Sequence, residues 1–288
     1  MFFFISKIIF SYFIRLLPVT ASALLLFSCQ DVINVNLNNA SPQLVIEGSI
    51  SNQPDTVMVS LSRTTDYFSP GTIAPVTDAT VSIFDSAGNS FQPTVSTDGN
   101  YLFLNLKGTP GKTYTLKVEA NGSEYVASSQ MPNVVEIDSL QVLKATDGDK
   151  ENDLYIYIHD PVNVANYYRV RIYRNGVLLT RDFINPIILF NDKYFDGRNT
   201  PLTISSRRFG LVSFLPSDVL RVQLMSIDQV TYFYFRELRD LTGLGRGFST
   251  STPDNPDNNI SNGALGYFAA WSIDEKTIVV QQTDQSKP

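Results

Sequence analysis

The sequence predicts a mainly β protein, in which an N-terminal β-sandwich of the immunoglobulin or transthyretin-like kind precedes a second β-rich domain carrying one helix. Short segments that alternate between apolar and polar residues recur along the chain, as expected of half-buried strands. Turn sequences rich in Gly, Pro, Asn and Asp separate these segments at regular spacing, which is typical of sandwiches. Only one stretch near the C-terminus changes to helical periodicity.

The first half, residues 42–132, contains a run of period-two segments. The dipeptide Asn121-Gly122 is favoured in two-residue hairpin turns and joins the last two of them. Pro132 ends the run. The predicted strands are 44–50, 56–62, 79–84, 101–106, 113–119 and 124–128.

The second half, residues 133–288, continues the β pattern, and Asn175-Gly176 is its clearest hairpin turn. Residues 191–200 are polar and predict a loop. Two separate closing strands are expected near the C-terminus. The division at Pro132 is one of two alternatives, because the sheets could also be continuous across it. The predicted strands are 137–143, 154–159, 167–174, 177–181, 219–225, 265–273 and 276–281.

One helix is predicted over residues 229–241. Asp228 is a suitable N-cap, and Gly243 supplies a stop after the last turn. Val230, Tyr234, Leu238 and Leu241 form an apolar stripe at near-helical spacing, which is the expected buried face.

The N-terminus has the order of a lipoprotein signal peptide. Residues 1–28 contain two basic residues, Lys7 and Arg15, and no acidic residue, followed by a short apolar region. The sequence Leu26-Phe27-Ser28-Cys29 fits the Leu-x-small-Cys box at which such signals are cleaved, with a bulkier residue than usual at Phe27. We therefore expect acylation of Cys29, with residues 29–41 as a tether to the membrane.

Two other interpretations of residues 1–28 are an uncleaved membrane anchor and an ordinary signal peptide. A spanning helix needs about 20 apolar residues with few charges. Arg15 and Pro18 interrupt the apolar segment, which favours cleavage.

Composition excludes several functional classes. The net charge is −6, and removal of residues 1–28 makes it −8. No basic patch or stripe of the kind that binds nucleic acid is visible, so no nucleic-acid partner is expected. Cys29 is the only cysteine, so an acylated chain has no disulfide, no thiolate metal site and no thiol nucleophile.

No motif predicts a catalytic set, a metal or a cofactor. His159 is the only histidine, and it stands at the end of a predicted strand, where a structural role is favoured over a Ser-His-Asp site. The glycines of residues 243–247 follow a helix instead of preceding one, so they do not form a phosphate loop.

Two acidic segments raise the alternative of a calcium site. Asp147, Asp149, Glu151 and Asp153 alternate within a turn, but the central Gly and terminal Glu of an EF-hand loop are not in place. A weaker group, Asp254, Asp257 and Asn258, lies in the long polar stretch 247–262. A solvated acidic turn is the favoured interpretation of both.

Aromatic residues could bind flat ligands such as sugars. Tyr267 and Trp271 share one face of a predicted strand with Leu265 and Ile273, and this apolar company favours a core position. The loop pairs 67–68 and 194–195 are better candidates for exposed aromatics.

Several segments resemble the domain-of-unknown-function 4249 lipoproteins of Bacteroidota. They are the Cys29 signal, Glu47-Gly48, Asp160-Pro161 before Tyr167-Tyr168-Arg169, Asn259-Ile260, and residues 263–272, where Trp271 stands in place of an expected Tyr. The resemblance covers nearly the whole mature chain. It implies an outer-membrane lipoprotein, on the periplasmic face or the cell surface, often encoded beside a TonB-dependent receptor. The family has no established catalytic residues to transfer.

The leading hypothesis is therefore a non-catalytic, lipid-anchored binding or accessory component of a TonB-dependent uptake system. A structural or adhesive surface protein is the first alternative, and it would show an exposed pairing edge. A glycoside-type hydrolase with two scattered carboxylates is the second, and it would show a cleft with two acids roughly 5 to 9.5 Å apart.

Overall fold

The structure is a computed structural model that describes residues 41–65, 73–144, 152–179, 187–209, 211, 213–241 and 254–281. The chain from Ser41 onward forms one compact unit. The predicted signal peptide 1–28, Cys29 and the tether up to residue 40 lie outside the described residues.

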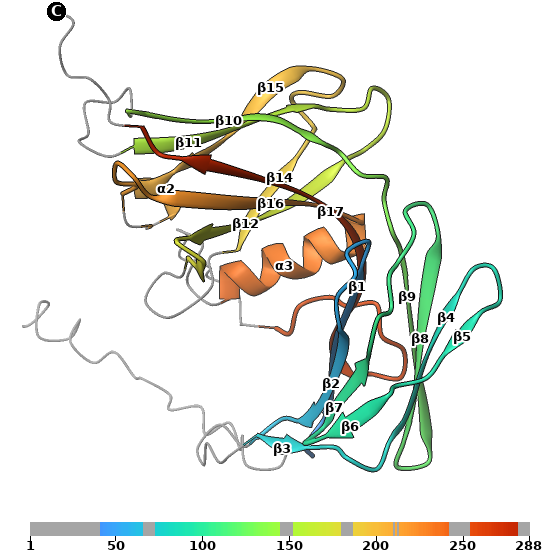
Figure 1. Ribbon diagram of the computed structural model, residues 1–288. Helices are drawn as coiled ribbons and strands as arrows, with labels where there is room; N and C mark the ends of the chain where they lie inside the picture. Colours follow the sequence, from blue (N-terminus) through green and yellow to red (C-terminus); the bar gives the residue numbers. More distant parts are fainter. Residues whose placement is uncertain are drawn as a thin grey trace, which may run out of the picture. The chain divides into compact units, whose positions relative to one another are not determined.

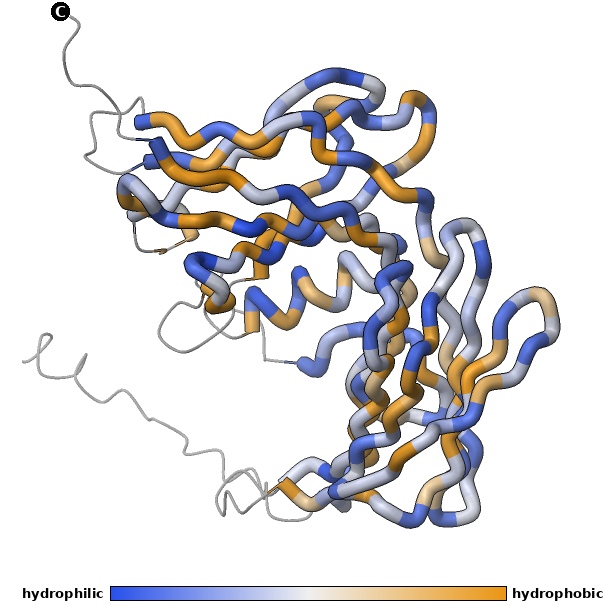
Figure 2. Tube along the Cα trace, in the orientation of Figure 1, coloured by the Kyte–Doolittle hydropathy of each residue, from blue (hydrophilic) through white to orange (hydrophobic). Residues whose placement is uncertain are grey.

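The prediction of a mainly β fold is confirmed. The strands alternate between hydrophobic and hydrophilic residues along much of their length (Figure 2). They are β1 (Leu44–Ser51), β2 (Val57–Arg63), β3 (Ala74–Pro75), β4 (Thr80–Asp85), β5 (Ser90–Phe91), β6 (Val95–Thr97), β7 (Asn100–Phe103), β8 (Thr113–Ala120), β9 (Ser123–Gln130), β10 (Ile137–Lys144), β11 (Asn152–His159), β12 (Tyr167–Arg174), β13 (Val177–Leu178), β14 (Ile188–Asn191), β15 (Asn199–Ser205), β16 (Val219–Ile227) and β17 (Leu265–Val279).

The N-terminal half forms the predicted β-sandwich. A four-stranded sheet, in the order β5-β4-β8-β9, packs against strands β1, β2 and β7. Alternate residues of both sheets are buried between them, with Ile46, Ile83 and Phe103 among the fully or almost fully buried side chains. Phe268 and Ala270, from the far end of the chain, belong to the same core.

The second half repeats the two-layer arrangement with different strands. A three-stranded sheet, β10-β11-β15, packs against β12 and β16 through Leu154, Ile156, Val170 and Leu224, all of which are buried. Strand β15 was not predicted, although Leu202 and Ile204 alternate with polar residues, and the predicted loop 191–200 is wrong at its ends, where Asn191 belongs to β14 and Asn199 begins β15.

Strand β17 joins the two halves (Figure 1). From Leu265 to Trp271 it pairs with β1 in parallel, and from Ser272 to Val279 it pairs with β16 in antiparallel fashion. The strands β13-β12-β16-β17-β1-β2-β7-β6 thereby form one continuous sheet. The sequence predicted two closing strands here, and that prediction is wrong: β17 is one strand of 15 residues.

The charged pair in the middle of β17 does not interrupt it, because both side chains find partners. Asp274 accepts a hydrogen bond from the backbone N–H of Ile137 at 2.7 Å, and Glu275 accepts one from Arg221 at 2.8 Å. A charge inside a strand is tolerated when it is exposed or paired.

Other hydrogen bonds cross the predicted boundary at residue 132. The Asn259 side chain donates to the carbonyls of Ser128 in β9 and Phe268 in β17, at 3.0 and 2.7 Å. Ile260 forms a bridge with Ala127. The division into domains 42–132 and 133–288 stays a prediction about folding. Strand β17 contributes Phe268 and Ala270 to the first core, and its Ile278 packs against the second.

Both predicted hairpin turns are confirmed. Asn121 and Gly122 have φ angles of 51° and 75°, and Asn175 and Gly176 have φ angles of 52° and 84°. Two consecutive residues with positive φ are the requirement of a type I′ turn, which Asn-Gly meets at low cost.

The predicted helix is confirmed as α3 (Gln229–Leu241), and α2 (Ser206–Phe209) is a single turn. The backbone N–H of Thr231 donates to Asp228 Oδ1 at 2.8 Å, which is the expected N-cap. The predicted apolar stripe is wrong at its ends, because Val230 and Leu241 are exposed. Tyr232 and Phe235 are buried in their place. Among the described residues, no helix has the length and apolarity needed to cross a membrane.

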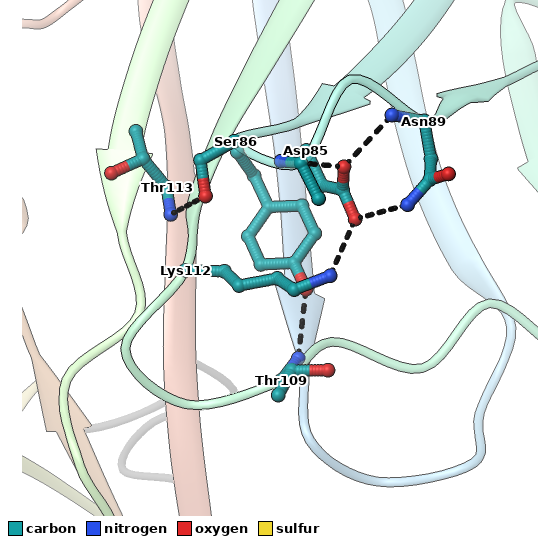
Figure 3. A network of polar contacts seen from close by, with 8 residues as sticks. Asp85, Ser86, Asn89, Thr109, Lys112 and Thr113 are labelled. Atoms are coloured by element: carbon teal, nitrogen blue, oxygen red, sulfur yellow. Dashed lines mark hydrogen bonds and ion pairs between the residues drawn. The ribbon is translucent and has the colours of Figure 1, made fainter.

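A polar network fixes the turn between β4 and β5 (Figure 3). Asp85 Oδ2 accepts from Lys112 Nζ at 2.7 Å and from Asn89 Nδ2 at 2.9 Å, while Oδ1 accepts from the backbone N–H groups of Ala87 and Asn89. The Lys112 ammonium and the Asn89 amide hold the pKa of Asp85 well below its ordinary value. All of these partners belong to the sandwich itself, so the network stabilises its fold.

Candidate functional site: an arginine and aromatic cluster

The odd-numbered residues of β12 place two arginines on one face of the long sheet. Tyr167, Arg169, Arg171 and Tyr173 alternate with Tyr168, Val170 and Ile172, which face the second core. Across the ladder, Arg169 lies opposite Met225, and Arg171 lies opposite Gln223. Helix α3 lies beside this face of β12, β16 and β17 (Figure 1).

Aromatic rings from α3 and β17 pack around these arginines. The rings of Phe235 and Tyr267 are 4.9 Å apart in an edge-on arrangement, and those of Tyr234 and Tyr267 are 5.2 Å apart. Phe235 and Trp271 are each 3% exposed. We call Arg169, Arg171, Phe235, Tyr267 and Trp271 the arginine–aromatic cluster.

Arg169 is a buried cation within this cluster. Its guanidinium carbon lies 4.0 Å from the centre of the Phe235 ring and 5.9 Å from that of Trp271. The residue is 8% exposed, and its Nη1 atom is buried without a hydrogen-bond partner. Burial, with a smaller contribution from the charge of Arg171, lowers the pKa of Arg169 to about 10. The group therefore keeps its charge at neutral pH.

A buried, charged donor without a partner is unusual, because burial of an unpaired charge is costly. Cation–π contacts return part of that cost, since the faces of aromatic rings attract cations. These ring contacts do not provide a hydrogen-bond acceptor for the Nη1 atom of Arg169. Such exceptions are a reason to look for a ligand at the site.

Arg171 completes the positive charge of the cluster. It is half-buried, and its guanidinium carbon lies 5.6 Å from the centre of the Trp271 ring. No salt bridge to Arg169 or Arg171 occurs among the residues that the structure describes. Burial raises the pKa of the Tyr267 hydroxyl, while the two arginines act in the opposite direction. Tyr267 is therefore neutral and does not compensate their charge.

Arg221, on the same sheet face, has the partners that the cluster lacks. Its guanidinium donates to Glu275 at 2.8 Å and lies 3.8 Å from the centre of the Tyr173 ring. The same Glu275 oxygen accepts a hydrogen bond from Gln223. Arg221 is thus a neutralised surface arginine, whereas Arg169 and Arg171 form a local excess of positive charge.

A pocket lies beside the two arginines, at the edge of β12. It has room for about one water molecule. Arg169 and Arg171 form part of its wall, but their guanidiniums pack against Phe235 and Trp271 on the opposite face of β12. The remaining lining residues are Val170, Ile172, Leu178, Leu179, Ile188 and Leu211.

The comparison with protein families decides the classification of the chain. The family model described as domain of unknown function (DUF4249) matches residues 30–277. The chain belongs to the DUF4249 family. The comparison with curated proteins found no match.

Two solved structures share low similarity with this DUF4249 member. One is a segment of two fibronectin type III domains from chicken tenascin, with 14% identity, coverage of 65% of this chain and 91% of that chain, and a TM-score of 0.20. The other is the BSP domain of a biofilm associated protein, with 12% identity, coverage of 86% and 30%, and a TM-score of 0.22. The β-sandwich is evident from the two packed sheets themselves.

Residues that carried the resemblance to the DUF4249 family meet in the structure. Tyr267 and Trp271 of β17 adjoin Arg169 of β12 within the cluster, and Glu47 of β1 lies opposite Tyr267 in the ladder. Gly48 fits closely against the first core, because a Cβ there would be 3.1 Å from Val59 Cγ2 and 3.3 Å from Phe268 Cδ2.

A second group of titratable residues lies at the opposite end of β12. Carboxylate oxygens of Asp160, Asp192 and Asp196 all lie within 4.8 Å of one another, and the first two residues are buried. Oxygen ligands of this kind suit calcium or magnesium. Burial, with the nearby charges of Asp192 and Asp196, raises the pKa of Asp160.

Internal hydrogen bonds account for the position of each of these carboxylates. Tyr168 and the backbone N–H of Gly197 donate to Asp160, and the backbone N–H of Asn166 donates to Asp192 Oδ2 at 2.7 Å. The backbone N–H of Asn163 donates to Asp196 at 2.9 Å. The group therefore has a structural role in ordering the loops, and no metal is assigned to it.

The structure places only some of the sequence-predicted site residues. His159 is exposed at the end of β11 and hydrogen-bonds to Asn199. Asp153 lies in β11, whereas Asp147, Asp149 and Glu151 lie outside the described residues, as do Cys29, residues 67–68 and residues 243–247.

Of the other candidates, Tyr194 is 80% exposed, and Trp271 has the buried position that the sequence predicted. In the long polar segment, the backbone N–H of Asp257 donates to Glu237, and the Asn258 side chain donates to the carbonyl of Ala264.

Sequence reasoning did not identify Arg169 or Arg171 as site residues. A usable signal was present: residues 169–173 alternate between Arg or Tyr and aliphatic residues, so one face of this part of the strand is basic and aromatic. The partners of that face come from residues 234–271, and no local pattern connects the two segments.

Proposed function

We propose that this DUF4249 protein is a lipid-anchored binding component of the outer membrane that works beside a TonB-dependent receptor. The observation that carries the proposal is the sequence Leu26-Phe27-Ser28-Cys29 after a basic and apolar leader. Acylation of Cys29 would hold the folded unit at the membrane, since two or more chains anchor stably. The association with a TonB-dependent receptor and with Bacteroidota is what the resemblance of the chain implies.

The arginine–aromatic cluster supports a role in binding. Arg169 is a buried cation whose Nη1 atom has no hydrogen-bond partner, and such an unsatisfied charged donor is a reason to expect a ligand. The chain has one histidine and one cysteine, and the cysteine is consumed by acylation. A binding role is therefore proposed in preference to catalysis.

Co-purification from native membranes tests the proposal. The protein is captured through a C-terminal tag after mild solubilisation of outer membranes, and the proteins that elute with it are identified and quantified. A TonB-dependent receptor in near-stoichiometric amount is the expected result. Recovery of the lipoprotein alone contradicts the accessory role, and recovery as self-polymers favours the structural alternative.

A Cys29→Ser variant provides the matched control for that experiment. It keeps the folded unit and removes the acylated thiol. We expect it to be absent from the outer-membrane fraction and to recover no receptor, which excludes association through detergent or the tag.

A further inference from the structure

We propose that Asn121, at the tip of the β8–β9 hairpin, is a site of spontaneous deamidation on the folded protein, and that Asn175 and Asn262 are protected from the same reaction. The chain contains three Asn-Gly pairs, at residues 121–122, 175–176 and 262–263. Such pairs are chemically labile, because glycine has no side chain to hinder attack by its own backbone nitrogen. This site is independent of the proposed binding role.

The reaction requires only water. The backbone nitrogen of the glycine loses its proton and attacks the side-chain carbon Cγ of the preceding asparagine. The new bond closes a succinimide ring, and the bond between Cγ and the amide nitrogen breaks as ammonia leaves. Water then opens the ring at either of its two carbonyls and gives aspartate or isoaspartate, with no change of oxidation state. Each event replaces a neutral amide by a carboxylate and so adds one negative charge.

The three pairs are alike in backbone conformation and in exposure. In chain order, the asparagines have φ angles of 51°, 52° and 59°, and the glycines have φ angles of 75°, 84° and 70°. All six residues are exposed, and no described atom lies within 4 Å of the position that a Cβ would take at any of these glycines. Access of water and space for the ring are therefore similar at each pair.

Hydrogen bonds hold the side chains of two of the asparagines. Asn175 Nδ2 donates to Asp218 Oδ1 at 3.0 Å, and Asn175 Oδ1 accepts from the backbone N–H of Val219 at 2.9 Å. Asn262 Nδ2 donates to the carbonyl oxygen of Glu124 at 2.8 Å. Ring closure turns the carboxamide away from these partners, so the bonds must break before the reaction proceeds.

Asn121 has no such constraint. Within the described part of the chain its side chain makes no hydrogen bond, so it can turn towards the nitrogen of Gly122. The charged residues of this hairpin pair with one another, because Lys117 Nζ lies 3.0 Å from Glu119 and 2.8 Å from Glu124. Loss of the Asn121 amide breaks no described hydrogen bond, and the folded state therefore does not oppose the reaction there.

Peptide mapping of the protein after incubation tests the proposal. The full mature lipoprotein in detergent is incubated at mildly alkaline pH, which favours attack by the glycine nitrogen, and samples are digested at acidic pH to prevent further reaction. Mass spectrometry then quantifies the amide and acid forms of the three peptides over time, and chromatography separates the aspartate and isoaspartate products.

Asn121 should deamidate roughly fivefold or more faster than Asn262, because one hydrogen bond opposes ring closure at Asn262. It should deamidate roughly tenfold or more faster than Asn175, where two hydrogen bonds oppose it and one of them has a charged acceptor. Equal rates at the three sites, or a faster reaction at Asn175 or Asn262, overturn the proposal.

The same protein unfolded in guanidinium chloride is the matched control. Without the fold the three side chains lose their different partners, so their rates should approach one another. A difference of the same size in the unfolded chain would assign it to local sequence and refute the protective role of the hydrogen bonds.

An Asn121→Gln variant assigns the reaction to one residue. Glutamine keeps an exposed amide but must close a larger ring, which is slower, so the acid form of this peptide should no longer accumulate. Accumulation at the wild-type rate would show that another residue of the peptide reacts, and it would overturn the assignment to Asn121.

Discussion

Replacement of Gly266 by alanine should strongly destabilise the protein, because β17 approaches β1 most closely at this residue. Gly266 has a φ angle of +100°, and a Cβ atom there would lie 2.0 Å from the carbonyl oxygen of Ile46, its partner in the parallel ladder. Neither the backbone conformation nor the space suits an L side chain.

The magnitude has two parts. An alanine forced to a positive φ costs about 1–2 kcal/mol. Relief of the clash requires β1 and β17 to separate, which costs about 1 kcal/mol for each backbone hydrogen bond lost, and we expect about two such bonds to break. Gly266→Ala should therefore lower the free energy of unfolding by about 3–4 kcal/mol.

Gly263 offers a matched control within the same segment. It has a φ angle of +70°, but nothing lies within 4 Å of the position that its Cβ would take. Gly263→Ala should therefore lower the free energy of unfolding only by the conformational part, about 1–2 kcal/mol. The difference between the two variants isolates the close approach of the two strands.

Equilibrium unfolding in urea, followed by Trp271 fluorescence, measures both values. Trp271 lies in the same ladder, opposite Ser51 of β1, so its emission reports on this pairing. Equal destabilisation by Gly263→Ala and Gly266→Ala would refute the parallel pairing of β1 with β17 as described.

Three further predictions concern stability. Phe268→Ala should lower the free energy of unfolding by about 3–5 kcal/mol in urea titrations, because this fully buried ring of β17 belongs to the first core. Asp228→Ala should lower it by about 1–2 kcal/mol in thermal melts, because it removes the N-cap of α3 and the 2.6 Å hydrogen bond from Ser129. The Lys112 ammonium lowers the pKa of Asp85, so the folded state binds a proton at this carboxylate more weakly than the unfolded chain does. The pair therefore stabilises the fold above a pH of about 4, and this stabilisation is lost as the pH falls further. Asp85→Asn should therefore unfold with a smaller loss of stability between neutral and acidic pH than the wild type, and an unchanged acid dependence would contradict this account.

Local sequence patterns predicted most of the elements. The alternation in 167–174 and the turn Asn175-Gly176 identified β12 and its hairpin, because strand period and turn conformation are set by neighbouring residues. Asp228 identified the start of α3 for the same reason. Which residues of α3 are buried depends on the sheet that it covers, so the predicted stripe that included Val230 was wrong.

The arrangement of the strands could not be predicted in this way. The pairing of β1 with β17 joins residues about 220 positions apart, and nothing in either segment specifies the other. The arginine–aromatic cluster depends on that arrangement, since Arg169 meets Trp271 only because β16 lies between their strands. Trp271 was correctly predicted to be buried, but the cation beside it could not be inferred from its own segment.

The mass of the N-terminal peptide of the mature protein, isolated from native outer membranes, tests the central claim most directly. The account predicts a chain that begins at Cys29 and carries a thioether-linked diacylglycerol, with the peptide retained in the detergent phase. A chain that keeps residues 1–28, or one cleaved elsewhere with an unmodified Cys29 thiol, would contradict the lipid anchor and with it the proposed place of this protein in the outer membrane.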